Sequence, residues 1–144
     1  MKKQIIIKSD SLKLIMKILH IEDNKSISEP IGIFLESNDH KYSSETNGRK
    51  GLDLIRENHY DVILLDLSMP EFSGFDVIDG LVKDGSIKNE KIVVLTASTL
   101  TPDEMNDLRS KGVHSSLGKP ILHEKLLEKL KLIEEGHTIT TNVN

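Results

Sequence analysis

Short apolar runs alternate with amphipathic segments along most of the chain. The runs at 62–65 and 91–95 consist mainly of valine, isoleucine and leucine, as in central strands that helices cover on both faces. Weaker runs predict three further strands. The predicted strands span residues 17–21, 41–44, 62–65, 91–95 and 113–117. Helical patterns separate them, which is typical of βαβ units on a parallel sheet.

Five helices are predicted from apolar spacing and terminal signals. Pro30 is expected within the opening turn of the first helix, where a missing N–H costs little. The second helix spans residues 48–57. Ser73 caps the third, and Thr101-Pro102-Asp103-Glu104 forms a capping box with proline at the start of the fourth. Gly112 ends the fourth helix and Gly136 the fifth. The residues expected to face inward are Ile31, Phe34 and Leu35; Leu52 and Ile55; Phe75, Ile78, Leu81 and Val82; and Leu122, Leu126, Leu130 and Ile133.

This pattern predicts an α/β fold, namely a flavodoxin-like, doubly wound five-stranded parallel sheet of order 2-1-3-4-5 with helices on both faces. The folded unit is expected to span residues 16–136, because Met16-Lys17-Ile18-Leu19 resembles a natural start. Residues 1–15 form an N-terminal extension without an assigned role. Residues 137–144 form a polar tail that we expect to be frayed.

Length, charge and composition limit the kinds of function that the chain could have. At 144 residues the chain has the size of one domain and no room for a separate output domain. A net charge of −4 without clustered basic residues argues against direct nucleic-acid binding. Cysteine is absent, which excludes disulfides and thiolate metal sites. No apolar stretch approaches the roughly 20 residues that span a bilayer. We therefore expect a cytoplasmic protein with no membrane contact.

Polar side chains follow four of the predicted strands. Glu22 and Asp23 end the first strand, Asp66 the third, Thr96 the fourth and Lys119 the fifth. The first and third strands are neighbours in the predicted order, so three carboxylates should converge. Two carboxylates about 4 Å apart repel by about 4 kcal/mol at an effective dielectric near 20. An all-oxygen site of this kind suits Mg²⁺, or Mn²⁺ in its place.

The same cluster suits phosphoryl transfer. Lys119 adds a positive charge and Thr96 a hydroxyl, and together with a metal these would neutralise a phosphoryl group in transit. Asp66 could then attack phosphorus and become an aspartyl phosphate. The six histidines are dispersed without metal-ligand spacing, and His20 is interpreted as a strand residue.

The chain resembles a receiver domain of a two-component response regulator, of the single-domain, chemotaxis-regulator-like kind. The resemblance covers residues 17 to about 135. It rests on Ile18-Leu19-His20-Ile21-Glu22-Asp23-Asn24, on Asp61-Val62-Ile63-Leu64-Leu65-Asp66-Leu67-Ser68-Met69-Pro70, and on Gly74, Thr96-Ala97, Gly112 and Lys119-Pro120. The acidic pair, acceptor, threonine and Lys-Pro in this order form a specific combination.

The resemblance implies roles for the matching residues. Asp66 would accept phosphate from a histidine kinase or a histidine phosphotransfer protein. Asp23 would bind Mg²⁺ directly, Glu22 through a water molecule, and Ser68 through its backbone carbonyl. Thr96 and Lys119 would contact the phosphoryl group, and the Lys119-Pro120 bond would be cis. The domain would be no enzyme beyond its own phosphorylation and dephosphorylation. Its downstream target is unknown, and it could form a homodimer.

Two positions depart from the family pattern. Ser73 stands where many receivers have aspartate, and its capping capacity is retained. Ser116 stands in the fifth strand where many have tyrosine or phenylalanine. In the family that aromatic side chain moves inward with the threonine. Phosphorylation is therefore expected to survive, while its readout is open.

Other interpretations remain at this stage. Asp66 and Thr96 could be ordinary strand ends, and Lys119 could be a solvated turn residue. Glu22-Asp23 could cap the first helix and interact favourably with its dipole. The favoured function is a stand-alone phosphorylation switch. The alternatives are an intermediate carrier in a multistep phosphorelay, a Mg²⁺-dependent phosphatase and a degenerate receiver scaffold. Ser68 weakens the phosphatase alternative, because such enzymes usually carry a second aspartate there.

Overall fold

The five predicted strands form a single parallel sheet. The computed structural model describes the backbone of residues 4–8 and 11–143 and the side chains of residues 14–136. The sheet consists of β3 (Lys17–Ile21), β4 (Lys41–Glu45), β5 (Val62–Asp66), β6 (Ile92–Thr96) and β7 (Ser115–Gly118). Its spatial order is β4-β3-β5-β6-β7, and every pairing is parallel. Counted along the chain this is 2-1-3-4-5, so the predicted topology is confirmed.

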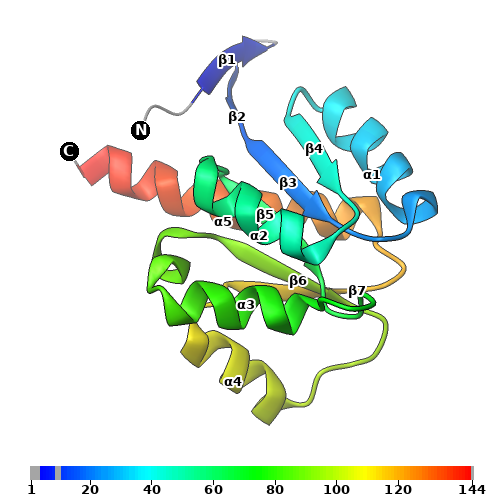
Figure 1. The fold of residues 1–144 in the computed structure, drawn as a ribbon. Helices are drawn as coiled ribbons and strands as arrows, with labels where there is room; N and C mark the ends of the chain where they lie inside the picture. Colours follow the sequence, from blue (N-terminus) through cyan, green and yellow to red (C-terminus); the bar gives the residue numbers. More distant parts are fainter. Residues whose placement is uncertain (1–3, 9–10, 144) are drawn as a thin grey trace.

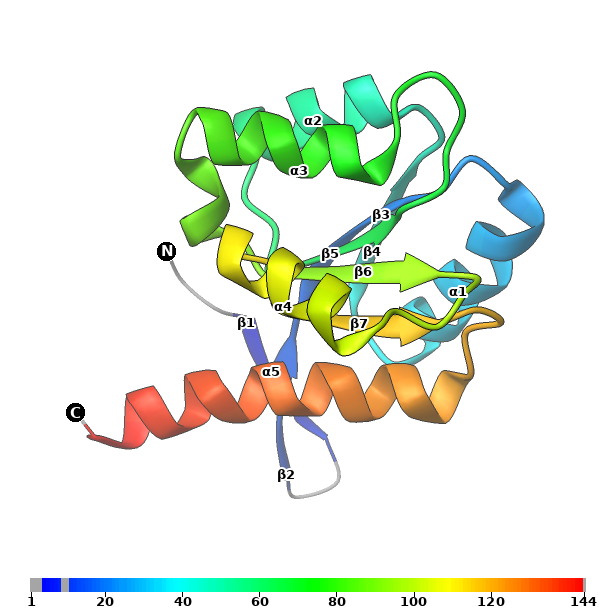
Figure 2. The ribbon, with the colours of Figure 1, turned by 90° about the horizontal axis from the view of Figure 1, so that it is seen from below.

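Helices cover both faces of the sheet (Figure 1). They are α1 (Lys25–Ser37), α2 (Gly48–Glu57), α3 (Gly74–Lys83), α4 (Pro102–Lys111) and α5 (His123–Val143), with the short 3-10 helix η1 (Ser86–Asn89) after α3. Apolar residues of α1 and α5 share one core, whereas those of α2, α3 and α4 share the other. Figure 2 shows α5 on one side of the sheet and α2 and α3 on the other.

The central strand β5 divides its side chains between the two cores. Val62 and Leu64 pack with α1 and α5, while Ile63 and Leu65 pack with α2, α3 and α4. All four are fully buried. This explains the continuous apolar run in the sequence, because successive strand residues point to opposite faces and both faces are covered.

The predicted capping signals of α3 and α4 are confirmed. Ser73 and Asp76 form a reciprocal capping box, and Thr101 and Glu104 form another. Gly112 ends α4 with a left-handed φ of 119°, a conformation that glycine adopts without the steric cost a Cβ would bring.

The position predicted for Pro30 was wrong. α1 begins at Lys25, with Asn24 as its N-cap accepting a hydrogen bond from the Ser26 N–H, so Pro30 lies inside the helix beyond its first turn. Proline there leaves the carbonyl of Ser26 without its helical partner. Ser26 and Pro30 are both exposed, so water can solvate that carbonyl.

The buried face predicted for α3 was wrong by part of a turn. Phe75 and Val82 are 47% and 41% exposed. The inward residues are Gly74, Val77, Ile78 and Leu81. A Cβ on Gly74 would lie only 2.8 Å from the Cα of Leu67. This close approach of two backbone segments sets the rotation of the helix, and Phe75 therefore faces outward.

The predicted limits of the fifth helix also differ from the structure. Leu126, Leu130 and Ile133 are buried as predicted, but Leu122 precedes α5 and is 52% exposed. The helix does not end at Gly136 and continues to Val143. Gly136 does not adopt the positive φ seen at Gly85 and Gly112, so it does not terminate the helix. Asn144 lies outside the described residues.

The N-terminal extension contains structure that the sequence did not predict. β1 (Gln4–Lys8) and β2 (Ser11–Ile15) pair antiparallel as a separate two-stranded hairpin. After β2, the chain enters β3 through Met16, which is fully buried in the core of α1 and α5. The domain boundary at residue 16 stays a prediction, and residues 1–3, 9 and 10 lie outside the described part.

Candidate functional site

The carboxyl ends of β3, β5 and β7 bring together acidic side chains and a lysine. Asp66 is the last residue of β5 and is 2% exposed, while Glu22 directly follows β3 and is 1% exposed. Asp23 is exposed at the rim. Each of these three residues offers a carboxylate oxygen, and the three oxygens lie within 4.8 Å of one another. The predicted convergence of carboxylates is therefore found in the structure.

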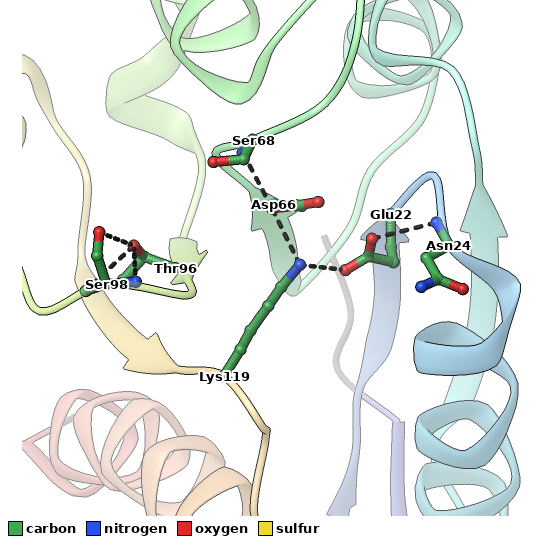
Figure 3. Close-up of polar contacts among 7 residues, drawn as sticks. All are labelled: Glu22, Asn24, Asp66, Ser68, Thr96, Ser98 and Lys119. Carbon is green, nitrogen blue, oxygen red and sulfur yellow. Dashed lines mark hydrogen bonds and ion pairs between the residues drawn. The ribbon is translucent and has the colours of Figure 1, made fainter.

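Lys119 bridges the two buried carboxylates (Figure 3). Its Nζ lies 2.8 Å from Oε1 of Glu22 and 3.1 Å from Oδ1 of Asp66. The backbone N–H of Lys119 donates to the carbonyl of Thr96, and the bond to Pro120 is cis, as the resemblance implied. Desolvation opposes the charge of Lys119, but the two carboxylates outweigh it and raise the pKa of the lysine.

One lysine does not balance the negative charge of this pocket. Desolvation raises the pKa of Glu22 to about 7, the Asp66 charge adds to the rise, and hydrogen bonds from Lys119 and the Asn24 N–H oppose it. Burial is the largest cause of this rise and disfavours the charged form of Glu22, and the negative charge of Asp66 acts in the same direction. Such an environment favours binding of a cation.

The donor set fits a hard divalent cation. Glu22, Asp23 and Asp66 offer oxygen ligands from converging elements, and Asp23 at the rim leaves one side of the site open to solvent. Oxygen ligands with room for water are what Mg²⁺ and Mn²⁺ prefer.

The segment after β5 holds one oxygen of Asp66 in place. The backbone N–H of Ser68 donates to Asp66 Oδ1 at 3.0 Å. Gly74 at the start of α3 packs against the backbone of Asp66 and Leu67 so closely that a side chain there would collide with it. The metal-binding role expected for the Ser68 carbonyl stays a prediction.

Thr96 ends β6 as predicted, but its hydroxyl is engaged elsewhere. Thr96 Oγ1 donates to the Ser98 carbonyl at 2.8 Å, and the Ser98 N–H donates back to Oγ1 at 3.2 Å. Figure 3 shows this pair set apart from the Asp66, Glu22 and Lys119 cluster. The structure thus brings Glu22, Asp23, Asp66 and Lys119 together and leaves the Thr96 hydroxyl in a local turn.

Two residues that the sequence did not assign to the site lie beneath it. His20 is fully buried in β3, and its Nδ1 lies 2.7 Å from the hydroxyl of Tyr42 in β4. Burial lowers the pKa of His20 to about 4, with the Lys119 charge acting in the same direction. The only sequence signal was a histidine between the apolar residues Leu19 and Ile21, in a strand whose neighbours are buried.

Comparisons with known proteins assign the family. The family model described as the response regulator receiver domain matches residues 18–131. The chain belongs to this family. The receiver domain is 29% identical over 114 residues to the polar-differentiation response regulator DivK of Brucella ovis, covering 79% of this chain and 92% of that protein.

Solved structures agree with this assignment. The chemotaxis protein CheY4 of Vibrio cholerae superposes with a TM-score of 0.74 at 26% identity, covering 83% of this chain and 98% of that chain. The receiver domain of the Francisella response regulator 1452 gives a TM-score of 0.75 at 25% identity, covering 85% and 98%.

Family membership carries general properties with it. Receiver domains bind Mg²⁺ at an acidic pocket, and in this chain Glu22, Asp23 and Asp66 form an acidic cluster. They interact with histidine kinases or phosphotransfer proteins and with downstream targets, and they are generally not classical enzymes. Within the described residues, no helix is both long enough and apolar enough to cross a membrane.

Proposed function

We propose that this receiver domain is a Mg²⁺-dependent phosphorylation switch in a two-component pathway. Asp66 takes a phosphoryl group from a phosphohistidine of a sensor kinase or phosphotransfer protein, and the domain then presents a changed surface to a downstream protein. One observation carries the proposal. A buried aspartate at a strand end shares its pocket with two further carboxylates within 4.8 Å and with a lysine 3.1 Å away.

The two oxygens of Asp66 are differently placed for this reaction. Oδ1 accepts from the Ser68 N–H and lies against the Lys119 ammonium, whereas Oδ2 takes part in neither of these two contacts. Oδ2 is therefore the oxygen available to attack phosphorus. As the new P–O bond forms, the P–N bond to the histidine breaks and its electron pair returns to the imidazole nitrogen. Lys119 supplies positive charge for the phosphoryl oxygens.

The carboxylates of Glu22, Asp23 and Asp66, with the backbone carbonyl of Ser68, would hold the cation. A bound Mg²⁺ supplies positive charge that offsets the negative charge of the pocket and of the phosphoryl oxygens. Lys119 alone brings one positive charge to a pocket that holds the three carboxylates of Glu22, Asp23 and Asp66.

Thr96 is the residue we expect to report the phosphorylated state. Its hydroxyl bonds the Ser98 carbonyl and must leave it to reach a phosphoryl group on Asp66. Exchanging one such hydrogen bond for another has a small net cost, about 1 kcal/mol or less. The segment after β6 would follow the hydroxyl and change the surface of α4, β7 and α5. Ser116 lies half-buried in β7, so this readout proceeds without an aromatic side chain at that position.

Phosphorylation by acetyl phosphate tests the proposal directly. The protein incubated with acetyl phosphate and Mg²⁺ should gain one phosphoryl group by intact mass, and Asp66→Asn should abolish the gain. Asp53→Asn is the matched control, because Asp53 is exposed on α2 outside the pocket. A wild-type protein that remains unlabelled, or a label that persists in Asp66→Asn, would refute the assignment.

A further inference from the structure

His20 lies directly beneath the acidic pocket. It pairs in register with Leu64 of β5, and residues two apart on a strand share a face. Glu22 follows His20 by two residues, and Asp66 follows Leu64 by two. The imidazole therefore occupies the layer immediately below both carboxylates, on the side of the sheet that faces α1 and α5.

The hydrogen bonds of His20 fix which ring nitrogen carries the proton. The Tyr42 hydroxyl donates to the carbonyl of Ser28 at 3.0 Å, and a carbonyl can only accept. The hydroxyl has a single proton, so its contact with His20 at 2.7 Å must be a bond donated by Nδ1–H. In the neutral ring, Nε2 then bears a lone pair.

That lone pair is unused. Nε2 is completely buried and has no hydrogen-bond partner among the described residues. Buried polar atoms in native proteins are nearly always paired, so an unpaired acceptor next to a functional site calls for a donor. Because Nδ1 is turned to Tyr42, Nε2 points to the other side of the ring, away from β4.

Lys119 has the matching unused donor. Its ammonium carries three N–H groups and contacts two partners in the described part of the chain, Glu22 and Asp66. The Lys119 and Asp66 charges are also those that act on the His20 ring. Lys119 and His20 do not bond in the present arrangement, so contact requires the ammonium to move away from one carboxylate. Phosphate and cation in the pocket would cause such a movement.

The other end of this chain of contacts is anchored in α1. Tyr42 bonds the carbonyl of Ser28, and its ring packs on Gly32 so closely that a Cβ there would lie 2.6 Å from the tyrosine Cε2. A movement of the Tyr42 ring must therefore displace α1 or break its contact with β4.

We propose that His20 is a positioning residue whose Nε2 accepts a hydrogen bond from Lys119 when the pocket is occupied, and that Tyr42 transmits the position of the imidazole to α1. The proposal rests on the proposed function, because occupancy of the pocket by phosphate and Mg²⁺ is what moves the lysine. It provides a route from Asp66 to α1 and β4 that needs neither Thr96 nor an aromatic residue at position 116.

Nitrogen-15 spectra of the whole chain test the proposal, with Mg²⁺ and beryllofluoride as a stable phosphoryl mimic. The Ser68 amide reports occupancy of the pocket, the His20 Nε2 signal reports its hydrogen bond, and the Gly32 amide reports α1. All three should shift in the wild type. In Tyr42→Phe the Ser68 and Nε2 signals should still shift, while the Gly32 shift falls to less than a third.

Variants of His20 separate positioning from packing. His20→Leu should keep the Ser68 shift and lose most of the Gly32 shift. Glutamine places a polar atom near the position of Nε2 but none at that of Nδ1, so His20→Gln can meet Lys119 but not Tyr42 and should also lose most of the Gly32 shift. His20→Asn mimics only Nδ1, can meet Tyr42 but not Lys119, and should lose it as well. His59→Gln is the control, since His59 lies before β5 at the opposite end of the sheet.

The outcomes distinguish the two proposals. If Ser68 does not shift in the wild type, the pocket does not bind the mimic, and both proposals are overturned. If Ser68 shifts while Nε2 and Gly32 stay unchanged, the role of His20 is overturned and the phosphorylation switch stands. A full Gly32 shift in His20→Gln or in His20→Asn would also overturn it. Should His20→Leu fail to fold, Tyr42→Phe and the wild-type Nε2 signal decide the question.

Discussion

The ammonium of Lys119 lies closer to Glu22 than to the proposed phosphoryl acceptor, with a distance of 2.8 Å to Oε1 of Glu22. Both side chains are largely buried. The lysine thus stabilises the acidic pocket before any phosphate arrives, and its removal should affect both folding and chemistry.

Replacing Lys119 by methionine should therefore destabilise the protein and slow its phosphorylation. Removing one partner of a buried ion pair costs about 3 kcal/mol, and the loss at pH 7 should shrink near pH 5 as Glu22 takes up a proton. Urea unfolding at the two pH values and the rate of labelling by acetyl phosphate measure the effects. Lys125→Met, at an exposed lysine of α5, should change neither. An unchanged labelling rate in Lys119→Met would contradict the role of the ammonium.

Mg²⁺ should stabilise the folded protein through the carboxylates. A ligand that binds only the folded state at ten times its Kd adds about 1.4 kcal/mol. The rise in melting temperature on adding Mg²⁺ should disappear in Asp23→Asn. It should persist in Asp53→Asn, which removes an exposed carboxylate of α2. Equal stabilisation of both variants would place the cation elsewhere.

The pH dependence of stability should reveal Glu22 and His20 as opposing groups. The pKa of Glu22 is raised from 4.5 to about 7. Its contribution to the free energy of unfolding is therefore full below pH 4.5 and is lost as the pH rises through 7. The pKa of His20 is lowered from 6.5 to about 4, so its contribution is full above pH 6.5 and is lost as the pH falls through 4. The two slopes oppose each other between pH 4.5 and 6.5.

Glu22→Gln removes the contribution of Glu22 to the pH dependence of stability and leaves that of His20. The free energy of unfolding should then rise more steeply with pH between 4.5 and 6.5 than in the wild type, which urea titrations at several pH values would detect. Parallel curves for the two proteins would show that Glu22 does not titrate in this range.

Thr96→Ala should separate phosphorylation from its readout. The threonine hydroxyl contacts only Ser98 among the described residues, so its loss should cost about 1 kcal/mol or less. Mg²⁺ affinity should be unchanged, because the hydroxyl is not in the carboxylate cluster. Amide shifts in α4 on adding beryllofluoride should be strongly reduced, whereas Thr99→Ala at the neighbouring exposed threonine should leave them intact. Full α4 shifts in Thr96→Ala would exclude the threonine as reporter.

Gly74→Ala should show how closely the acceptor is packed against α3. A Cβ at this position would meet the backbone of Asp66 and Leu67, which cannot rotate away as a side chain could. Overpacking of this kind costs about 1 to 3 kcal/mol. Gly136→Ala is the control, because among the described residues nothing apart from its chain neighbours and the backbone of its own helix lies within 4 Å of its Cβ position. Thermal unfolding that leaves both variants at wild-type stability would contradict the close approach.

The features that the sequence predicted correctly have local signals. The run at β5 marks a strand that is covered on both faces, and Thr101 with Glu104 marks a helix start, because these residues act on their own neighbours. The strand order follows from the alternation of strands and helices and places Asp66 beside Glu22. Most of the acidic pocket was therefore predictable.

The features that were missed depend on contacts between distant segments. Phe75 faces outward because Gly74 packs against the backbone of Asp66 and Leu67. The sequence of α3 itself does not indicate that contact. His20 was placed in a strand, but its bond to Tyr42 depends on the pairing of β3 with β4. The orientation of the Thr96 hydroxyl depends on the loop conformation at Ser98.

The hairpin of β1 and β2 enters the sheet at the amino end of β3, while Glu22 follows the carboxyl end of the same strand. Five strand residues at about 3.3 Å each separate the two ends by roughly 16 Å. A fluorophore, an affinity handle or a surface tether attached at the hairpin therefore leaves the pocket open to kinase, cation and small phosphodonors. The hairpin is the natural point for immobilising the protein in binding measurements.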